Sequence, residues 1–98
     1  MRKKSSKLAK LERERYSIFT NNLKSCYYCG NSRAIDIHEV YGGSNRQRSM
    51  KYGLCVPLCR NCHSNVNIIS DLRKHCQKEY EKTHSRDEFI KLIGKSYL

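Results

Sequence analysis

Two pairs of cysteines constrain the fold of this chain more than any other feature of its sequence. Two residues separate Cys26 from Cys29, and two residues separate Cys59 from Cys62. Four thiolates at this spacing supply a closed tetrahedral shell for a structural zinc ion. A disulfide scaffold is the alternative, but the chain opens with charged residues and lacks the apolar run of a secretory signal. We therefore predict a structural zinc site in a reducing compartment.

The small size of the chain gives this zinc site a role in stability. The chain has 98 residues, of which 38% are hydrophobic and none is tryptophan, so it can bury only a modest core. A metal that crosslinks distant segments compensates for such a core. We expect a single domain, and we assign the two remaining cysteines, Cys55 and Cys76, to its core.

The charge balance of the chain is strongly positive. Lysine and arginine total 20 against 9 aspartates and glutamates, which gives a formal net charge of +11. Such an excess is typical of proteins that bind polyanions, most often nucleic acid, and a merely solubilising role explains it less well. The sequence contains no apolar stretch long enough to span a membrane. We expect a cytoplasmic protein without a membrane partner.

The two terminal segments are predicted to be helical. Residues 1–25 form a basic tail that merges into a helix reaching about Phe19. Residues 85–98 form a C-terminal helix that begins at a capping box of Ser85 and Glu88. The predicted inward face and stop of this last helix are Phe89, Ile90 and Ile93, followed by Gly94.

Residues 26–84 are predicted to form the core, with two short strands and one long helix. A strand over residues 35–38 alternates apolar and polar side chains, and a second over residues 54–58 contains Pro57, which restricts it to an edge or an end of the sheet. A loop over residues 42–49 connects them. From residue 59 the apolar period becomes helical. One helix is therefore predicted to carry Cys59, Cys62, His63 and Asn67, and an inward edge of Val66, Ile69, Leu72, Cys76 and Tyr80.

Three further side chains remain after the cysteines are assigned to zinc. His38 and Glu39 end the first strand, and His63 follows Cys62 directly. They offer the hard nitrogen and oxygen ligands that suit a second, catalytic metal. On one helix, His63 and Asn67 would share a face that is rotated away from the thiolates. The sequence therefore predicts a structural metal and a catalytic metal side by side.

These residues lie in motifs that carry a family resemblance. The motifs are Cys26-Tyr27-Tyr28-Cys29, His38-Glu39-Val40-Tyr41-Gly42-Gly43 and Leu58-Cys59-Arg60-Asn61-Cys62-His63. The segment over residues 26–67, a little under half of the chain, resembles the HNH endonucleases of the zinc-stapled type, especially small HNH proteins of bacteriophages and prophages. The resemblance implies an α+β fold, namely a small treble-clef zinc-bound ββα-metal (HNH) core with flanking helices.

The resemblance also implies a function. A protein of this family would be a metal-dependent DNA endonuclease that hydrolyses phosphodiester bonds, with double-stranded DNA as the expected partner. It would act in phage DNA processing or packaging, together with other phage proteins, in the cytoplasm of a bacterial host. The catalytic divalent metal would be Mg²⁺, Mn²⁺, Ni²⁺ or Zn²⁺.

Roles for individual residues follow from the same resemblance. His63 is expected to bind the catalytic metal, and Asn67 is either a further ligand or an ordinary hydrogen-bonding asparagine. For His38 and Glu39 two assignments stay open. Either His38 binds the metal and Glu39 is the general base, or His38 is the base and Glu39 or Asp36 binds the metal, since residues two apart share a strand face.

Basic residues of the central loop and of the long helix are expected to contact phosphates. The position of the family's central asparagine holds Leu54 in this chain, and Asn45 is a candidate to replace it. An alternative function also stays open, namely a non-catalytic, zinc-stabilised nucleic-acid-binding module in which Glu39 marks a decayed HNH site. The predicted phosphate contacts are Arg46, Arg48, Lys51 and Arg60.

Overall fold

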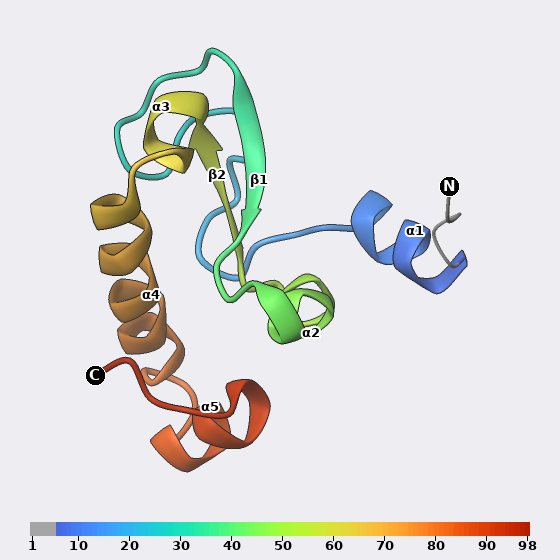
Figure 1. Ribbon diagram of the computed structural model, residues 1–98, viewed down its shortest axis with the longest axis vertical. Helices are drawn as coiled ribbons and strands as arrows, with labels where there is room; N and C mark the ends of the chain where they lie inside the picture. The colour runs from blue at the N-terminus through green and yellow to red at the C-terminus, as the bar shows by residue number, and fades with distance from the viewer. Residues whose placement is uncertain (1–5) are drawn as a thin grey trace.

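The computed structural model describes residues 6–98 (Figure 1). Helices surround a hairpin of two antiparallel strands, so the predicted α+β class is confirmed. The first five residues of the predicted basic tail lie outside the described residues. No helix within residues 6–98 has the length and apolar character needed to cross a bilayer. In chain order the elements are α1 (Ser6–Arg13), β1 (Ile35–Glu39), the 3₁₀ helix η1 (Gly43–Asn45), α2 (Arg46–Lys51), β2 (Cys55–Cys59), α3 (Arg60–His63), α4 (Val66–Tyr80) and α5 (Arg86–Ile93).

The hairpin of β1 and β2 is the only sheet within the described part of the chain, and both strands lie within one residue of their predicted positions. Its antiparallel register pairs Ile37 with Pro57 and Glu39 with Cys55. Pro57 has no N–H to donate, which a two-stranded sheet tolerates because each strand has an unpaired edge. The Pro57 carbonyl accepts a hydrogen bond from the Tyr27 N–H at 2.7 Å. This bond fixes the segment of the first cysteine pair to β2.

The connection between the strands contains a short helix, α2, where we predicted a loop. Its buried Ser49 donates a hydrogen bond to the Tyr41 carbonyl at 2.7 Å and accepts one from the Tyr41 N–H at 3.3 Å. These bonds satisfy backbone groups of Tyr41 just beyond the end of β1. A helix as short as α2 depends on such tertiary contacts, because its own propensity is too weak to hold it. Sequence periodicity therefore gave little sign of it.

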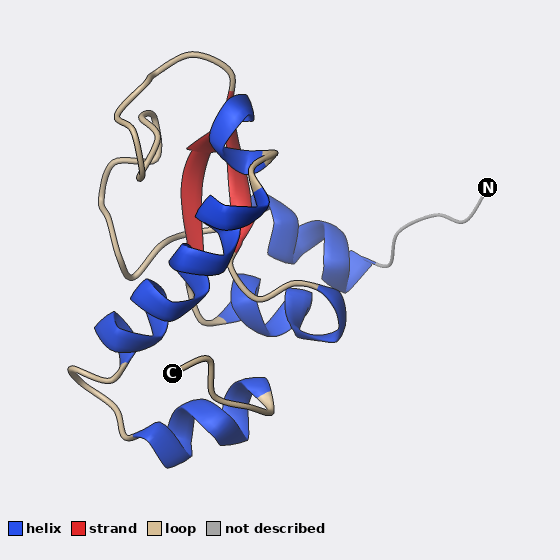
Figure 2. Ribbon diagram, turned by 60° about the vertical axis from the view of Figure 1, so that its left-hand side comes forward, coloured by secondary structure: helices blue, strands red, loops and turns tan. Residues whose placement is uncertain are grey.

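The long helix predicted from residue 59 is divided into α3 and α4, and this corrects the prediction of a single helix. Asn65 begins α4 as its N-cap, with its side-chain oxygen accepting from the N–H groups of Asn67 at 3.0 Å and Ile68 at 3.2 Å. The chain direction changes at this cap, so Val66 is 79% exposed instead of facing inward. Helix α3 contacts both strands, whereas α4 runs away from the hairpin toward α5 (Figures 1 and 2).

Helix α1 is also shorter than predicted, because it ends at Arg13 and not near Phe19. The Ser17 hydroxyl accepts hydrogen bonds from the N–H groups of Phe19 and Thr20, which replaces a helical turn by a local side-chain turn. The segment then lies across Gly53, whose carbonyl accepts from the Ile18 N–H at 2.9 Å. The N-terminal segment is thus fixed to the connection before β2.

The C-terminal helix α5 begins and ends as predicted. Ser85 and Glu88 form the capping box, and Gly94 ends the helix with a φ of 104°. Phe89 packs edge-on against Tyr41, with ring centroids 5.3 Å apart. Ile90 was predicted to face inward, but it is 37% exposed. The core that α5 closes contains Val40, Tyr41, Leu54, Val56, Leu58, Leu72, Cys76, Tyr80, Phe89 and Ile93.

Asn45 connects this C-terminal helix to the segment between the strands. Its side-chain amide donates to the Ile93 carbonyl at 2.8 Å, and its oxygen accepts from Arg48 at 3.2 Å. Asn45 therefore ties down the η1–α2 segment from the C-terminal side.

Candidate functional site

The four predicted zinc ligands lie together where β2 meets α3. Their Sγ atoms all lie within 4.8 Å of one another. A tetrahedral zinc shell with Zn–S bonds of about 2.3 Å places its sulfurs about 3.8 Å apart, so the cluster has the size that one ion requires. The cluster could therefore hold a structural metal ion. Its members are Cys26, Cys29, Cys59 and Cys62.

Backbone donors favour the ionised form of one of these thiols. Burial raises the pKa of Cys26, but N–H groups of Cys29, Cys59 and Tyr28 outweigh burial and lower this pKa from 9.0 to about 6. Burial raises the pKa of the Cys62 thiol, and its hydrogen bonds with the sulfurs of Cys59, Cys26 and Cys29, together with the charge of Cys26, raise it further. Since a metal binds the thiolate form, the cluster is ready to exchange protons for a cation.

Cys55 and Cys76 lie outside this cluster, as predicted. Both are completely buried. Burial raises the pKa of each thiol to about 12, so both stay protonated at neutral pH. The Cys55 thiol donates weakly to the Ser49 carbonyl at 3.7 Å. These two cysteines are core residues.

A second group of polar side chains lies beside the sulfur cluster. Asp36 and His38 are two residues apart on β1 and share one strand face. His63, at the end of α3, approaches both of them. Its Nδ1 lies 3.3 Å from Asp36 Oδ2, and its ring centroid lies 5.0 Å from that of His38 in an edge-to-face arrangement. Because Cys62 fixes the start of α3 to the cluster, it also fixes the position of His63.

His38 is the most buried member of this group, and its chemistry reflects that burial. Burial is the largest cause that lowers its pKa to about 4, followed by the positive charge of His63. His38 is therefore neutral at neutral pH. Its Nε2 atom is buried and has no hydrogen-bond partner within residues 6–98. A buried ring nitrogen without a partner costs free energy unless water, a metal or a ligand meets it.

The described residues contain only one group of three or more side chains close enough for a single ion, namely the sulfur cluster. Asp36, His38 and His63 are neighbours without forming a closed shell. Asp36 and His63 keep 39% and 38% of their side-chain surface exposed, so the open side of the group faces solvent. One carboxylate and two imidazoles of this kind suit a catalytic divalent metal in their chemistry.

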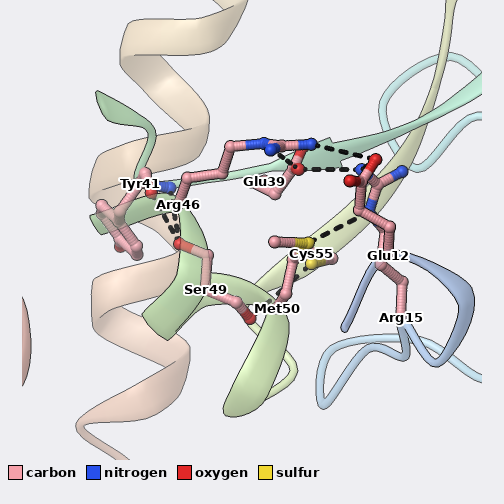
Figure 3. A network of polar contacts seen from close by, with 8 residues as sticks. All are labelled: Glu12, Arg15, Glu39, Tyr41, Arg46, Ser49, Met50 and Cys55. Atoms are coloured by element: carbon pink, nitrogen blue, oxygen red, sulfur yellow. Dashed lines mark hydrogen bonds and ion pairs between the residues drawn. The ribbon is translucent and has the colours of Figure 1, made fainter. Parts of the chain in front are cut away.

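Glu39 lies apart from this group, in a network of ion pairs on the other face of β1 (Figure 3). Its Oε1 accepts hydrogen bonds from Arg15 Nη2 at 3.1 Å and from Arg46 Nε at 2.9 Å. Glu12 joins the same two arginines, at 3.6 Å and 3.4 Å. Since successive strand residues point to opposite faces, Glu39 and His38 cannot contact the same metal ion or substrate in this arrangement. Glu39 instead fixes the segment after α1 and the start of α2 to β1.

The other predicted site residues are spread over the surface. Asn67 is exposed in the first turn of α4, and its side chain makes no hydrogen bond to Asp36, His38 or His63 within residues 6–98. The break between α3 and α4 explains this, because Asn67 no longer follows His63 on one helix. The predicted phosphate contacts divide between two places, with Arg60 on α3 and the other three, Arg46, Arg48 and Lys51, on α2.

Two residues in these arrangements were missed by the sequence analysis. Arg15 belongs to the predicted basic tail, and its pairing with Glu39 crosses 24 residues without any local spacing to indicate it. Arg73 on α4 was not considered, and its charge contributes to the lowered pKa of His38. For Asp36 a signal existed, since it lies two residues before His38 on one strand.

Comparisons with known proteins found no match for this chain. No protein-family model, curated protein or solved structure matches the chain. Its likeness to the HNH endonucleases therefore stays an interpretation of its motifs, and the geometry of the site carries the functional argument.

Proposed function

We propose that this protein is a metal-dependent DNA endonuclease that hydrolyses phosphodiester bonds at Asp36, His38 and His63. The observation that carries the proposal is the convergence of one carboxylate and two imidazoles beside the sulfur cluster. In this proposal the hairpin and α3 form a treble-clef ββα-metal core of the HNH type, as the motifs predict. Phage or prophage origin and action in a host cytoplasm stay predictions.

Zinc is the metal that we propose for the sulfur cluster. Four thiolates are soft ligands, which select zinc over the hard cations magnesium and calcium. The cluster joins the segment before β1 to the end of β2 and the start of α3. A metal there would crosslink parts of the chain that are distant in sequence, which is the expected role of a structural zinc in a small domain.

His38 is the proposed general base. Its ring is unprotonated at neutral pH and its Nε2 has no hydrogen-bond partner among residues 6–98, so this nitrogen can accept a proton from the attacking water. The water oxygen forms a bond to phosphorus, the bond from phosphorus to the leaving oxygen breaks, and that oxygen takes a proton from solvent. Asp36 orients His63 through their 3.3 Å contact, and both would hold a divalent metal. When bound, this metal supplies positive charge that stabilises the phosphate oxygens in the transition state.

DNA is the proposed substrate because the positive charge of the chain matches a polyanion. A net charge of +11 on 98 residues attracts the phosphate backbone and raises the rate of encounter. The motifs left Glu39 as a possible base or metal ligand. In this proposal Glu39 has a structural role, because two arginines already bind its carboxylate.

A non-catalytic nucleic-acid-binding module is the second candidate. It is favoured by the finding that Asp36, His38 and His63 do not form a closed group around one point. In that case the zinc site would stabilise a basic surface, and wild-type protein would bind DNA without cutting it.

Cleavage of supercoiled plasmid separates these two candidates. Purified protein would be incubated with plasmid and Mg²⁺, Mn²⁺ or Ni²⁺, with EDTA as the negative control. Metal-dependent conversion to nicked or linear DNA is expected, together with its loss in His63→Ala. His75→Ala is the matched control, since His75 is an exposed histidine on α4 whose ring contacts Tyr27 at 2.9 Å and neither Asp36 nor His63. Metal content would confirm that the sulfur cluster, which lies beside Tyr27, is intact in this control. DNA binding without cleavage at any metal would favour the non-catalytic module.

A further inference from the structure

A basic groove of about 620 Å³ lies between α1, α2 and α5. Each of the three helices contributes cationic side chains to its walls, and no acidic side chain among residues 6–98 lines it. The basic residues of the groove are Lys7, Arg46, Arg48, Lys51 and Lys91.

Most of these charges are not neutralised by the protein. Arg46 is held by Glu39 at 2.9 Å and by Glu12 at 3.4 Å. The four others have no ion-pair partner in the described part of the chain. Like charges gathered along a groove repel one another and attract an extended anion. The groove therefore suits a chain of phosphates better than a single anion.

A second hollow of about 570 Å³ adjoins the groove. The two share Tyr52, Lys91 and Leu92 in their walls. Tyr52 is 44% exposed and Ile18 is 48% exposed, which is a large apolar surface for side chains that face water. The stacked rings of Tyr80 and His84, with centroids 4.1 Å apart, also line this hollow. The hollow thus offers aromatic and apolar walls directly beside the basic groove.

We infer that a single-stranded segment of nucleic acid binds along this groove, with an unpaired base in the adjoining hollow beside Tyr52. The choice of nucleic acid as the ligand rests on the proposed function. Phosphates contact Lys7, Arg48, Lys51 and Lys91, and the base fills the aromatic hollow. In a duplex the bases are stacked and paired, so none is available for such a pocket. Glu88 at the edge of the hollow does not oppose this, because a base carries no charge.

This surface is separate from the proposed catalytic group. Arg46 lines the groove and also pairs with Glu39, so the groove lies on the side of β1 that Glu39 faces. Asp36 and His38 face the opposite side, toward His63. A strand held in the groove would position nucleic acid on the protein without touching the group that performs hydrolysis.

The test is binding of a fluorescein-labelled oligothymidylate of about 20 nucleotides, compared with a duplex of equal length, without added divalent metal. The double variant Lys7→Ala/Lys91→Ala removes two charges from the groove. Its matched control, Lys74→Ala/Lys78→Ala, removes two charges from exposed positions of α4 outside the groove. Fluorescence anisotropy at several salt concentrations gives the affinity and its salt dependence for each.

For the groove variant, the log–log salt dependence on the single strand should be shallower by about 1.4, which corresponds to two lost phosphate contacts. The α4 control should keep the wild-type slope. Tyr52→Leu keeps an apolar side chain and should weaken single-strand binding by roughly 5- to 160-fold, the range for one stacked base. The same substitution should leave duplex binding within about twofold. Circular dichroism and metal content confirm that each variant is folded.

Three results would overturn the inference. The first is a wild-type protein that does not bind the single strand at low salt. The second is the same salt slope for the groove variant and the α4 control, and the third is a Tyr52→Leu variant that binds the single strand like the wild type or loses affinity for the single strand and the duplex alike. His63→Ala should bind like the wild type. A protein that passes these binding tests but cuts no plasmid contradicts only the proposed hydrolysis, and one that cuts plasmid but fails them contradicts only the groove.

Discussion

The two faces of β1 are fixed to the rest of the molecule by different kinds of interaction. On one face, Asp36 and His38 meet His63, whose position depends on a cluster of four cysteines. On the other face, Glu39 binds two arginines that come from the segment after α1 and from α2. Two short cysteine motifs, each with a recognisable spacing, organise the first face, although 30 residues separate Cys29 from Cys59. Ion pairs that belong to no motif organise the second face, with Arg46 7 residues and Arg15 24 residues from Glu39.

The two kinds of interaction should respond differently to the loss of a single side chain. A sulfur cluster acts as a unit, because loss of one thiolate opens the whole shell. An ion-pair network on a partly exposed face contributes in parts, because solvent screens each pair and other contacts remain. We therefore expect large, all-or-none effects on the cysteine side and graded effects on the Glu39 side.

The largest effect is expected from the cysteines. Cys26→Ser or Cys62→Ser should release the metal and unfold most of the chain, because structural zinc contributes about 10–16 kcal/mol in small domains, as much as their whole stability. Cys55→Ser and Cys76→Ser are the controls and should keep the metal, at a cost of about 1–3 kcal/mol for a buried hydroxyl. Metal analysis measures the metal content of each variant, and circular dichroism measures whether the variant is folded. Wild-type protein without tightly held zinc would contradict this.

A substitution at Gly53 should have the next largest effect. Gly53 has a φ of 72°, and a Cβ placed there would lie 2.5 Å from Tyr16 Cε2 and 2.9 Å from Ile18 Cγ2. Gly53→Ala should therefore cost about 2–5 kcal/mol, from the left-handed backbone and from the displaced N-terminal segment. Gly30→Ala is the control, since its φ is 80° and a Cβ there meets no atom within 4 Å.

Denaturant unfolding measures both glycine variants. Gly30→Ala should show only the smaller backbone cost. Equal losses in the two proteins would mean that the segment over residues 16–18 does not pack against the connection before β2.

The Glu39 anchor should give a smaller, graded effect. Its side chain is 14% exposed, so Glu39→Gln removes the nearer carboxylate partner of Arg15 and Arg46. The two arginines keep only the longer contacts with Glu12 at 3.6 Å and 3.4 Å, and the loss should cost about 1–3 kcal/mol in the free energy of unfolding. Glu79→Gln is the control, because Glu79 forms an exposed pair with Lys82 and should change stability little. Limited proteolysis near residue 15 should rise only in Glu39→Gln. Unchanged stability and proteolysis would show that Glu39 does not hold the N-terminal segment.

The same contrast explains which parts of the molecule could be predicted from the sequence. The cysteine cluster and the capping box of Ser85 and Glu88 depend on spacings of three residues, which are visible in the chain itself. Both strands were predicted to within one residue at their ends, the first of them from its alternation of apolar and polar residues. Each of these features has a local pattern that can be recognised in the sequence, even where its partner lies far along the chain.

Features without a recognisable sequence pattern were missed. Helix α2 is held by Ser49 and its bonds to Tyr41, and the charged sequence around it resembles a loop. Asn65 is a typical N-cap residue, yet the helical spacing on both sides of it concealed the break. The role of Glu39 depends on Arg15, 24 residues away. Spacing placed Glu39 next to His38 in sequence, but strand alternation separates them in space.

The most direct test of the account compares plasmid cleavage by His38→Ala and Glu39→Gln, two neighbouring positions on opposite faces of β1. Rates would be measured with saturating Mn²⁺, well below the unfolding temperature of either variant, with metal content confirming the sulfur cluster. The account predicts that His38→Ala loses about 10²- to 10⁴-fold in rate, as expected for a general base, while Glu39→Gln stays within a few fold of the wild type. Loss of cleavage in Glu39→Gln with a near wild-type rate in His38→Ala would contradict it.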